Sequence, residues 1–513
     1  MMLALGLGIV FALIVGIAAA RSRRAEAIII PLLDVFQSIP ILGFFPIIIF
    51  GIYGLIPNEF GASLAIIFLI FTSMSWNIAF GVYEAVKAIP QDYVDLLDIS
   101  HAGTWQRIRT LYIPASMSRI AYNTQISWAV GLFYLVSSEI ITSGSTKVPI
   151  SYGIGFRAMS FAASQDYGNY VLSIAELVIA VVIWRFVFLR EFALWSEQFK
   201  MVEEPREIHR DPVMRFYSWV NHKSISKLFL LAHGKGVNRF TSSIHRFRRG
   251  IQYAILIVVA LFFSLEVAGI VSSGISFRFP PVATFLSDEL TAILGLVVSF
   301  VRVWYSWAIC VAIGLPLGIA ISLNFKLYDT VSPILEVISS IPAPILLPAI
   351  VLIPFIGSSG EGVAALVIIL GIFWYIVFNV MAGVRTLPDD LKGLPKAVHV
   401  GRLSAWRNVY IPGAMTALVT GSITAIGGAW NTLIVAEYFS VTRCTGNVCN
   451  TAVLTQVGTG IGKVITQATS QGAAGLPELT LAILSMTVLI VVFNLTVWRR
   501  VYNHVTKRYA YNR

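Results

Sequence analysis

QSIPILGFFP (37–46) and SSIPAPILLP (339–348) lie in the two halves of one chain, each inside a strongly apolar segment. Both contain Ser-Ile-Pro, and in both another proline stands six positions after the proline of that motif. A proline inside a helix removes a backbone hydrogen bond and kinks the helix. The two stretches therefore predict one kinked, apolar helical element that occurs twice.

The composition indicates a protein that lies mostly in a membrane. Of 513 residues, 57% are hydrophobic and only 12% are charged, and the mean hydropathy is +0.79. A soluble domain has about a quarter of its residues charged, so this chain has too few charges to cover the surface of one. The composition predicts an all-α polytopic membrane protein and excludes a soluble multidomain enzyme.

About eleven stretches are long and apolar enough to cross a bilayer, which takes about 20 residues each. The first of them precedes the basic run RSRR (21–24). A signal peptide has its positive charge before the apolar run, so we expect a membrane helix with the N-terminus outside. The eleven stretches are 3–20, 28–53, 62–83, 121–142, 168–189, 251–273, 292–322, 330–356, 362–382, 416–438 and 477–498.

The basic residues predict the orientation of these spans. In this arrangement, 31 of the 37 Lys and Arg residues fall in cytoplasmic segments, as the excess of positive charge on cytoplasmic loops requires. The net charge of +11 therefore reports membrane orientation rather than nucleic-acid binding, and the C-terminus is expected in the cytoplasm. We expect a first transmembrane domain (1–190), a basic cytoplasmic linker (191–250), an extra span with an outer loop (251–290) and a second domain (291–513).

The second half repeats the first. Matched Pro, Gly, His, Arg and Glu residues in one order are a stronger signal than matched apolar residues. At an offset of 302, the pairs are Gly16/Gly318, Pro31/Pro333, Asp34/Glu336, Ser38/Ser340, Pro40/Pro342 and Pro46/Pro348; at an offset of 298, they are Pro90/Pro388, His101/His399, Gly103/Gly401, Arg109/Arg407, Tyr112/Tyr410, Pro114/Pro412 and Glu139/Glu437. With one extra span between them, the halves have the same orientation and form a parallel repeat, which places a substrate path between them.

The candidates for that path are polar or bent positions within the spans. A serine, a neighbouring helix or water is expected to bond the backbone carbonyl that each proline frees; the alternative is that the prolines only shape packing. Ionisable groups inside spans are functional candidates by default, and the two glutamates could line an outer gate, contact a partner, or pair with Arg157 or Lys463. The predicted pathway residues are Ser38, Pro40, Ser340, Pro342, Glu139, Glu437, Trp430 and Asn431, whereas Trp76 and Asn77 are expected to pack.

Two cytoplasmic segments carry the most specific pattern: DYVDLLDISHAGTWQRIRTLYIPA (92–115) and DDLKGLPKAVHVGRLSAWRNVYIPG (389–413). Each follows a proline, predicts a short helix and a glycine-containing turn, and ends in Tyr-Ile-Pro at the start of the next span. A short helix between two spans is not needed for insertion. Two such helices in matched positions indicate docking points for two copies of a cytoplasmic partner.

These segments resemble the cytoplasmic loop of permease subunits in binding-protein-dependent ABC importers of the nitrate, sulfonate and taurine type. The family loop reads E-A-A, three residues, G, and about a dozen residues to a proline; here Asp95 stands for the Glu and His101 for the Gly, while the second copy has Gly393 and His399. Neither copy has the full pattern. The stretches SWNIAFGVYEAVKAIP (75–90) and GGAWNTLIVAEYF (427–439) also resemble permeases of this group that fuse two halves in one chain.

The resemblance implies a tandem repeat of a five-helix type I importer core in the plasma membrane. It implies that each loop sits in a groove of a separate ATPase subunit, which binds ATP and Mg, and that an extracytoplasmic binding protein delivers a small solute such as nitrate or a sulfonate. No cofactor is expected on this chain. The residues implied in ATPase coupling are Asp95, His101, Gly103, Arg109, Pro114, Gly393, His399, Gly401, Arg407 and Pro412.

The chain itself is not expected to hydrolyse ATP. Its nearest approach to a nucleotide-binding G-x-x-x-x-G-K-[ST] loop is VGTGIGKVI (457–465), which has Val where the first Gly and the Ser or Thr are needed. Cys444 and Cys449 are close enough for a disulfide if their loop faces outward, and no metal site is expected. The alternative function is an ion-coupled secondary transporter, which would need acidic relays deep in the spans and no paired docking helices.

Overall fold

The computed structural model describes residues 1–38, 40–143, 152–199, 282–445, 448–471 and 475–509. The unit described below comprises Met1–Phe199 and Ile275–Arg513. The expected extra span 251–273 lies outside the described residues, as does most of the expected linker 191–250.

The first half is helical along its described residues. Its elements in chain order are α1 (Met2–Arg21), α2 (Arg23–Ser38), α3 (Ile41–Leu55), α4 (Glu59–Lys87), α5 (Gln91–Ile99), α6 (Thr104–Arg107), η1 (Ile108–Tyr112), α7 (Ile113–Ser143), α8 (Ile154–Ala163), α9 (Tyr167–Trp184), η2 (Arg185–Leu189) and α10 (Arg190–Glu197).

The second half follows the same order and adds a β-hairpin. Its elements are α15 (Val282–Leu323), α16 (Phe325–Ser339), η4 (Ala343–Leu346), α17 (Leu347–Val351), α18 (Gly360–Arg385), α19 (Asp389–Ala397), α20 (Arg402–Ala405), η5 (Trp406–Tyr410), α21 (Ile411–Glu437), β1 (Tyr438–Thr445), β2 (Val448–Gln456), α22 (Ile461–Ser470), α23 (Leu476–Phe493), η7 (Asn494–Trp498) and α24 (Arg499–Tyr509).

The repeat seen in the sequence is a repeat of helices. Each element of the first half has a counterpart in the second, including the π-helical segments η1 and η5 at the start of α7 and α21. Matched glycines have matched roles: a Cβ at Gly16 would lie 2.8 Å from Val82, and one at Gly318 would lie 2.8 Å from Val380. The small residue lets α1 approach α4 and α15 approach α18, as small residues do at helix contacts in membranes.

The Ser-Ile-Pro segments are breaks rather than kinks. In the first half, α2 ends at Ser38 and α3 begins at Ile41. In the second half, Lys326–Ser339 and Ala343–Val351 meet at 76°. The expectation of a continuous kinked helix was therefore wrong, because Pro40 and Pro342 adopt extended conformations and a proline also disfavours the α conformation of the residue before it.

Most of the expected spans are present. Among the described residues, seven helices are long and apolar enough to cross a membrane, or eight if the bent pair of α16 and η4–α17 counts as one span. These eight correspond to expected spans. Of the others, 28–53 is divided between α2 and α3, and 121–142 lies in α7.

The expectation of an all-α fold was incomplete, because β1 and β2 pair as an antiparallel hairpin. Their sequences are rich in Val and Thr, and the two residues between them are Gly446-Asn447, a short-hairpin signal. The register pairs Thr445 with Val448. The hairpin follows α21 and contacts α8 of the first half, so it joins the two halves at one end.

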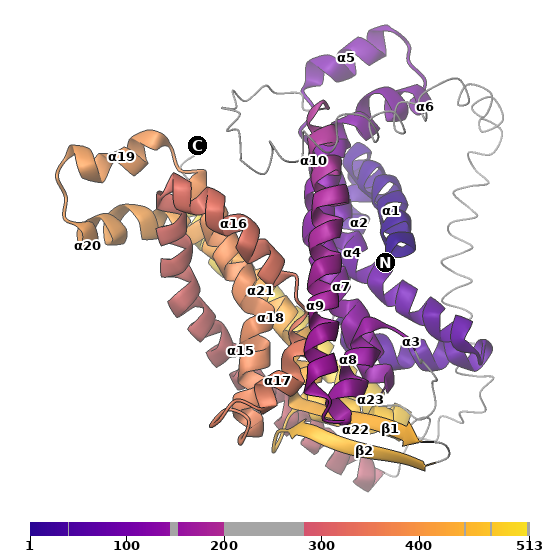
Figure 1. Ribbon diagram of the computed structural model, residues 1–513. Coiled ribbons are helices and arrows are strands. Elements are labelled where there is room, and N and C mark those ends of the chain that lie inside the picture. The colour runs from indigo at the N-terminus through magenta and orange to yellow at the C-terminus, as the bar shows by residue number, and fades with distance from the viewer. Residues whose placement is uncertain (39, 144–151, 200–281, 446–447, 472–474, 510–513) are drawn as a thin grey trace. The chain divides into compact units, whose positions relative to one another are not determined.

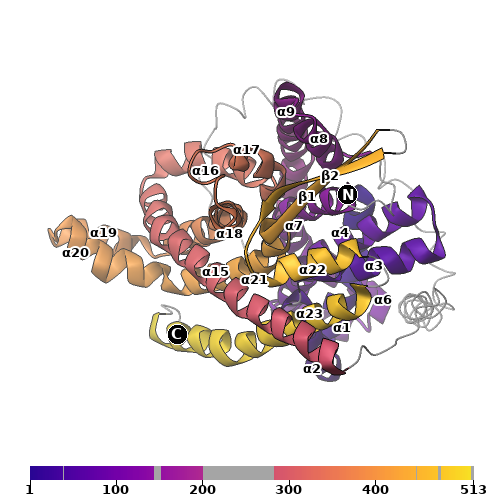
Figure 2. The same cartoon turned by 90° about the horizontal axis from the view of Figure 1, so that it is seen from below.

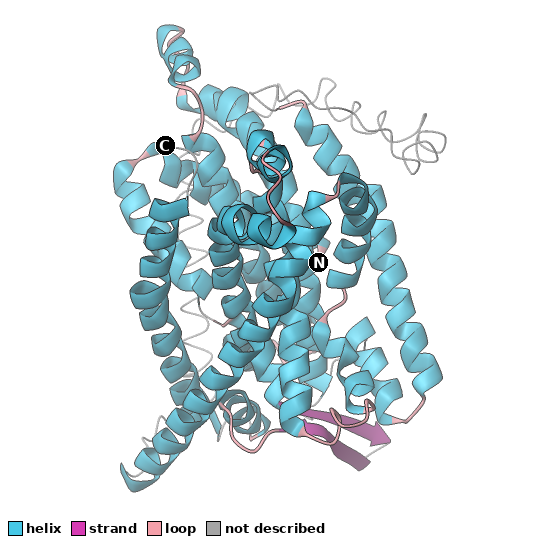
Figure 3. Cartoon of the chain, turned by 90° about the vertical axis from the view of Figure 1, so that its left-hand side faces the viewer, coloured by secondary structure: helices cyan, strands magenta, loops and turns pink. Residues whose placement is uncertain are grey.

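The two ends of the described unit carry different features (Figures 1 and 3). The short helix pairs α5–α6 and α19–α20 lie at one end, and the β1–β2 hairpin lies at the opposite end. Seen from the hairpin end in Figure 2, the strands lie across the ends of helices from both halves. We call these the coupling end and the hairpin end.

Candidate functional site

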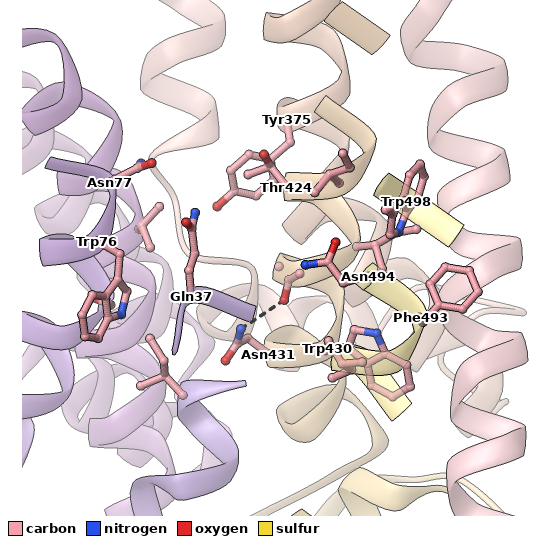
Figure 4. A pocket seen from close by; sticks show the side chains of 18 of the residues that line it. Gln37, Trp76, Asn77, Tyr375, Thr424, Trp430, Asn431, Phe493, Asn494 and Trp498 are labelled. Atoms are coloured by element: carbon pink, nitrogen blue, oxygen red, sulfur yellow. Dashed lines mark hydrogen bonds between the residues drawn. The ribbon is translucent and has the colours of Figure 1, made fainter. Parts of the chain in front are cut away.

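A cavity of about 240 Å³ lies between the halves. Figure 4 shows its walls: Gln37 and Asn77 come from the first half, and Tyr375, Thr424 and Asn431 from the second. Its lining side chains carry amides, hydroxyls and aromatic rings, and none carries a formal charge. The lining residues are Gln37, Ile41, Ser73, Trp76, Asn77, Val130, Tyr134, Phe300, Trp304, Tyr375, Ile423, Thr424, Ile426, Gly427, Gly428, Trp430, Asn431, Leu489, Ile490, Phe493, Asn494 and Trp498.

The cavity contains some of the predicted pathway residues and several that were missed. Trp430 and Asn431 line it as expected. Trp76 and Asn77, which were expected only to pack, also line it. Their signal in the sequence was the same as that of Trp430 and Asn431, namely a Trp-Asn pair within an apolar helix.

Asn431 has a specific partner in the other half. Its Oδ1 accepts a hydrogen bond from the Leu42 backbone N–H at 3.2 Å, and its Nδ2 donates to the Gly427 carbonyl in its own helix at 3.1 Å. Leu42 is the second residue of α3, where helical N–H groups lack partners within the helix. Pro40 is the N-cap residue and makes no side-chain cap. Asn431 therefore caps a helix of the other half.

Ser340 bonds a carbonyl one turn back at the second break, although not the Ile338 carbonyl that Pro342 frees, which accepts from the Ile341 N–H. Its hydroxyl donates to the Glu336 carbonyl at 2.7 Å, while its backbone N–H bonds the Val337 carbonyl instead. Pro342 is the N-cap residue of η4. The Glu336 side chain pairs with Arg185 of η2, so the second helix break is also held by the first half. Pro40 is buried at the first break. The side chain of its serine neighbour, Ser38, lies outside the described set.

Glu437 is buried in a polar network at the hairpin end. Its carboxylate accepts from Ser299 at 2.5 Å and from the Gly462 N–H at 2.7 Å, and it pairs with Arg302. Arg302 is 1% exposed and also forms a two-pronged ion pair with Glu361, at 2.7 and 2.9 Å. A bidentate pair of this kind is among the stronger protein ion pairs.

Glu139 occupies the matching place in the first half. Its carboxylate accepts from the Gly155 N–H at 2.7 Å, at the first turn of α8. In each half, Gly-Ile-Gly thus wraps a carboxylate from the end of the preceding long helix. The expected partners differ from the observed ones: Arg157 pairs with Glu176, and Lys463 donates to the carbonyls of Val457 and Gly458.

The first coupling segment is a short helix pair held by an arginine. α5 ends at Ile99, and Gly103 is the N-cap residue of α6. Arg107 reaches back to Asp98 at 2.5 Å and donates to the Ala102 carbonyl at 2.8 Å. Asp95, Arg109 and Pro114 are placed on the same segment; Asp95 accepts from Gln91 at 3.0 Å, Arg109 is exposed, and Pro114 opens α7.

The second coupling segment has the same order of helices and turns as the first, but a different side chain holds it. Gly401 is the N-cap residue of α20, and the Tyr410 hydroxyl donates to the Lys392 carbonyl at 3.3 Å. Ala405 stands at the position of Arg107. The remaining predicted residues are all on this segment: Gly393 and Arg407 are exposed, and Pro412 lies in the first turn of α21.

His101 and His399 adopt the same unusual backbone conformation. Their φ angles are 49° and 54°. This left-handed region is disfavoured for residues with a Cβ and suits glycine. Each histidine ends its turn where the resembling family has glycine, so the turn geometry is retained while the residue type is not.

Apolar side chains on both segments point away from the protein. None of the residues of α5 is buried, and Ile99 and Leu403 are 78% and 85% exposed. Leu96, Trp105 and Val398 are exposed as well. An apolar surface rimmed by polar residues is typical of a protein contact.

The two cysteines of the hairpin lie opposite each other. The strand register pairs Cys444 with Cys449. The disulfide stays a prediction. Among the described residues, no group of three or more His, Cys, Asp or Glu side chains is arranged to hold a metal ion.

Comparison with known proteins matches this architecture. Residues 8–193 and 311–511 each match the family described as binding-protein-dependent transport system inner membrane component. The chain is 28% identical over 157 residues to the taurine transport system permease protein TauC of Escherichia coli, which covers 31% of this chain and 56% of TauC. It is 28% identical over 143 residues to the nitrate import permease protein NrtB of Synechocystis (27% of this chain, 50% of NrtB).

A third relative is the bicarbonate transport system permease protein CmpB of Synechococcus elongatus, 29% identical over 141 residues that cover 28% of this chain and 50% of CmpB. The chain spans about half the length of the curated relatives it matches. The family match itself covers most of the chain and occurs once in each half, which confirms the predicted doubling of a permease domain and a non-catalytic membrane component. The chain therefore belongs to the family of inner membrane components of binding-protein-dependent transport systems.

Proposed function

We propose that this chain supplies both halves of the permease of an ATP-driven importer, in which it passes a small solute toward the cytoplasm. The observation that carries the proposal is the pair of exposed helix segments, α5–α6 and α19–α20, at one end of a doubled helical unit that holds a cavity between its halves. Two matched docking segments suit two ATPase subunits. A secondary transporter has no use for them.

The exposed apolar residues supply the contact surface for the ATPases. Ile99 and Leu403 project from the two segments. The chain would bind neither ATP nor Mg, and both would be held by the partner subunits. An extracytoplasmic binding protein would deliver the solute at the hairpin end.

The proposal includes a membrane orientation. The coupling end lies in the cytoplasm, the N-terminus outside and the C-terminus inside, which places the basic residues as described above. It also includes an eleven-span, parallel arrangement, with the extra span between residues 251 and 273. The proposed domain boundaries are those expected from the sequence, with a first transmembrane domain at 1–190 and a second at 291–513.

The solute is proposed to be small. A cavity of about 240 Å³ is below the usual range of drug-sized pockets. The relatives are named for taurine, nitrate and bicarbonate, which are all small. The cavity walls offer amide and hydroxyl groups that donate hydrogen bonds, and these can solvate a small anion without a fixed positive charge.

The test is co-purification with a functional readout. A tagged chain, extracted in mild detergent from its native membrane, should bring down an ATP-hydrolysing subunit. Leu403→Asp places a charge in the proposed contact, so it should reduce both the recovered ATPase and substrate-stimulated hydrolysis by at least about tenfold.

A matched control separates contact from general surface change. Phe355 is 93% exposed on the loop between α17 and α18, away from the coupling segments, so Phe355→Asp should leave the recovered ATPase unchanged. The proposal fails if no ATPase is recovered, or if the purified chain alone moves solute in liposomes under an ion gradient.

A further inference from the structure

At each helix break, a polar side chain of the opposite half hydrogen-bonds the backbone that follows the break. Asn431 on α21 bonds the Leu42 N–H at the start of α3, at 3.2 Å. Tyr170 on α9 donates its hydroxyl to the Ile345 carbonyl in η4, at 2.7 Å. The repeat offset of 302 makes Leu42 and Pro344 equivalent, so the two bonds reach neighbouring positions in the two copies of the break.

Both bonds are buried. Asn431 is 8% exposed and Tyr170 is 2% exposed, and their partners Leu42 and Ile345 are fully buried. Water therefore does not replace either partner while the bond is closed. A buried backbone group that loses its partner costs free energy, so each bond opposes separation of the two breaks.

The two bonds are not copies of each other. The position equivalent to Asn431 in the first half is Phe133. Tyr170 is the fourth residue of the eighteen-residue helix α9, and the fourth residue of the eighteen-residue helix α23 is Leu479. Packing alone would not require a polar group on each side of the interface. Each half supplies one side chain that bonds the backbone of the other half, so the two bonds join the halves in both directions.

The Asn431–Leu42 bond lies at the hairpin-end edge of the cavity, whereas the Tyr170–Ile345 bond lies outside the cavity lining, at the start of α9. Among the residues of α21 that line the cavity, Asn431 is nearest the hairpin. Ile423 lies at the opposite edge, earlier in the same helix and therefore about 12 Å nearer the coupling end. η4 contacts α8 and α21 at this end. The third tie between the halves, Arg185 to Glu336, lies about 22 Å along α9 and η2 from Tyr170, toward the coupling end.

We propose that Asn431 and Tyr170 are gate residues, whose hydrogen bonds across the halves close the cavity at the hairpin end. This inference rests on the proposed transport function and names a step of it. Release of the two bonds frees the starts of α3 and η4 to move apart, and the cavity then opens toward the side from which the solute arrives.

The test measures from which side of the membrane the cavity is reached, and it needs no ATPase. Cys310, Cys444 and Cys449 are first replaced by Ala or Ser, and Thr424→Cys then places a single thiol in the cavity wall. Vesicles of both orientations are treated with a membrane-impermeant maleimide. In the parent chain, the thiol should react from the coupling side only.

Asn431→Leu and Tyr170→Phe each remove one bond between the halves at nearly constant volume; Asn431→Leu also removes the bond to the Gly427 carbonyl within α21. Each should raise the rate of labelling from the hairpin side by about tenfold, as expected from the loss of one buried hydrogen bond, and the double variant should raise it further. Tyr170→Phe removes a single oxygen, so it tests the gate even if Asn431→Leu does not accumulate.

Two controls lose bonds that stay within the second half. Thr432→Val removes a bond from Thr432 to Gly428 in the same helix, and Tyr410→Phe removes the bond to Lys392. Equal labelling of gate and control variants would overturn the proposal, as would labelling of the parent from the hairpin side. Failure of ATPase recovery would instead count against the proposed function.

Discussion

His101 and His399 occupy matched positions in the two halves, although the backbone conformation at both is unfavourable for residues other than glycine. Both have positive φ, at 49° and 54°. The left-handed conformation costs an L-residue about 1–2 kcal/mol. The resemblance to the family loop located these turns in the sequence. It could not show that the histidines retain the backbone conformation that suits the glycine of the family loop.

The first prediction concerns His101. His101→Gly should leave the turn as stable or make it more stable, whereas His101→Val should destabilise it by about 1–2 kcal/mol because a β-branched residue tolerates positive φ poorly. Hydrogen exchange of the amides of residues 97–104 measures this local stability. Slower exchange in the Val variant than in the Gly variant would contradict the argument.

The second prediction concerns the glycine that wraps Glu437. A Cβ at Gly462 would lie 2.9 Å from the Ile434 Cα and 3.0 Å from the Glu437 carboxylate. Since these atoms are backbone or held by Arg302, Gly462→Ala should destabilise the protein by about 1–3 kcal/mol.

Thermal unfolding in detergent measures the Gly462 effect. The control is Gly458→Ala in the same loop, where an added Cβ meets nothing within 4 Å. If the two variants unfold at the same temperature, the wrapped carboxylate does not constrain the hairpin end.

Sequence reasoning found Glu139 and Glu437 as a matched pair but not their partners. Arg302 lies in α15, which begins before the region that the repeat offset matches to the first half. The Gly-Ile-Gly contacts are made by backbone N–H groups, which a sequence does not distinguish. The repeat could predict that the glutamates share a role, and only the packing could show what they bond.

At the scale of elements, the two coupling segments have the same order of helices and turns but are held by different side chains. Arg107 binds Asp98 and the Ala102 carbonyl in the first, while Tyr410 binds the Lys392 carbonyl in the second. The stiffness of each short helix pair therefore depends on different residues. A charge-assisted bond is generally stronger than a neutral one.

The third prediction follows from the contacts of Arg107. Arg107→Ala should speed hydrogen exchange of residues 97–103 by about tenfold, because it removes charge-assisted bonds worth about 1.5–3 kcal/mol. The second segment, 395–401, should exchange as before. Arg109→Ala, at an exposed position two residues away, is the control, and an equal effect of both variants would show that Arg107 does not hold the segment.

Element positions were predicted well wherever apolar length decided them, as for α1, α4, α15 and α18. The Ser-Ile-Pro stretches were found, but whether they kink or break depends on bonds made from elsewhere, such as Asn431 to Leu42. The hairpin was missed because its strands were read as an outer loop, although Gly446-Asn447 between Val- and Thr-rich runs was a visible signal.

At the scale of the molecule, the doubling places unlike walls around one cavity. The first half supplies Gln37, Trp76 and Asn77, and the second supplies Tyr375 and Thr424. The repeat predicted a path between the halves. It could not give the size of the cavity, since that depends on how far the breaks let α3 and η4 approach the opposite half.

The size of the cavity leads to the last prediction. Thr424 is exposed to the cavity, and its hydroxyl bonds only one turn back, to the Thr420 carbonyl at 3.2 Å. Thr424→Trp should fill much of a space of about 240 Å³ and so reduce solute uptake at least about tenfold, while expression and ATPase recovery stay unchanged, because the coupling segments are remote. Thr420→Trp places the same ring one turn nearer the coupling end, outside the cavity lining, and should reduce uptake much less. Uptake is measured with the purified complex in liposomes; equal uptake by the two variants would mean that solute does not pass through this cavity.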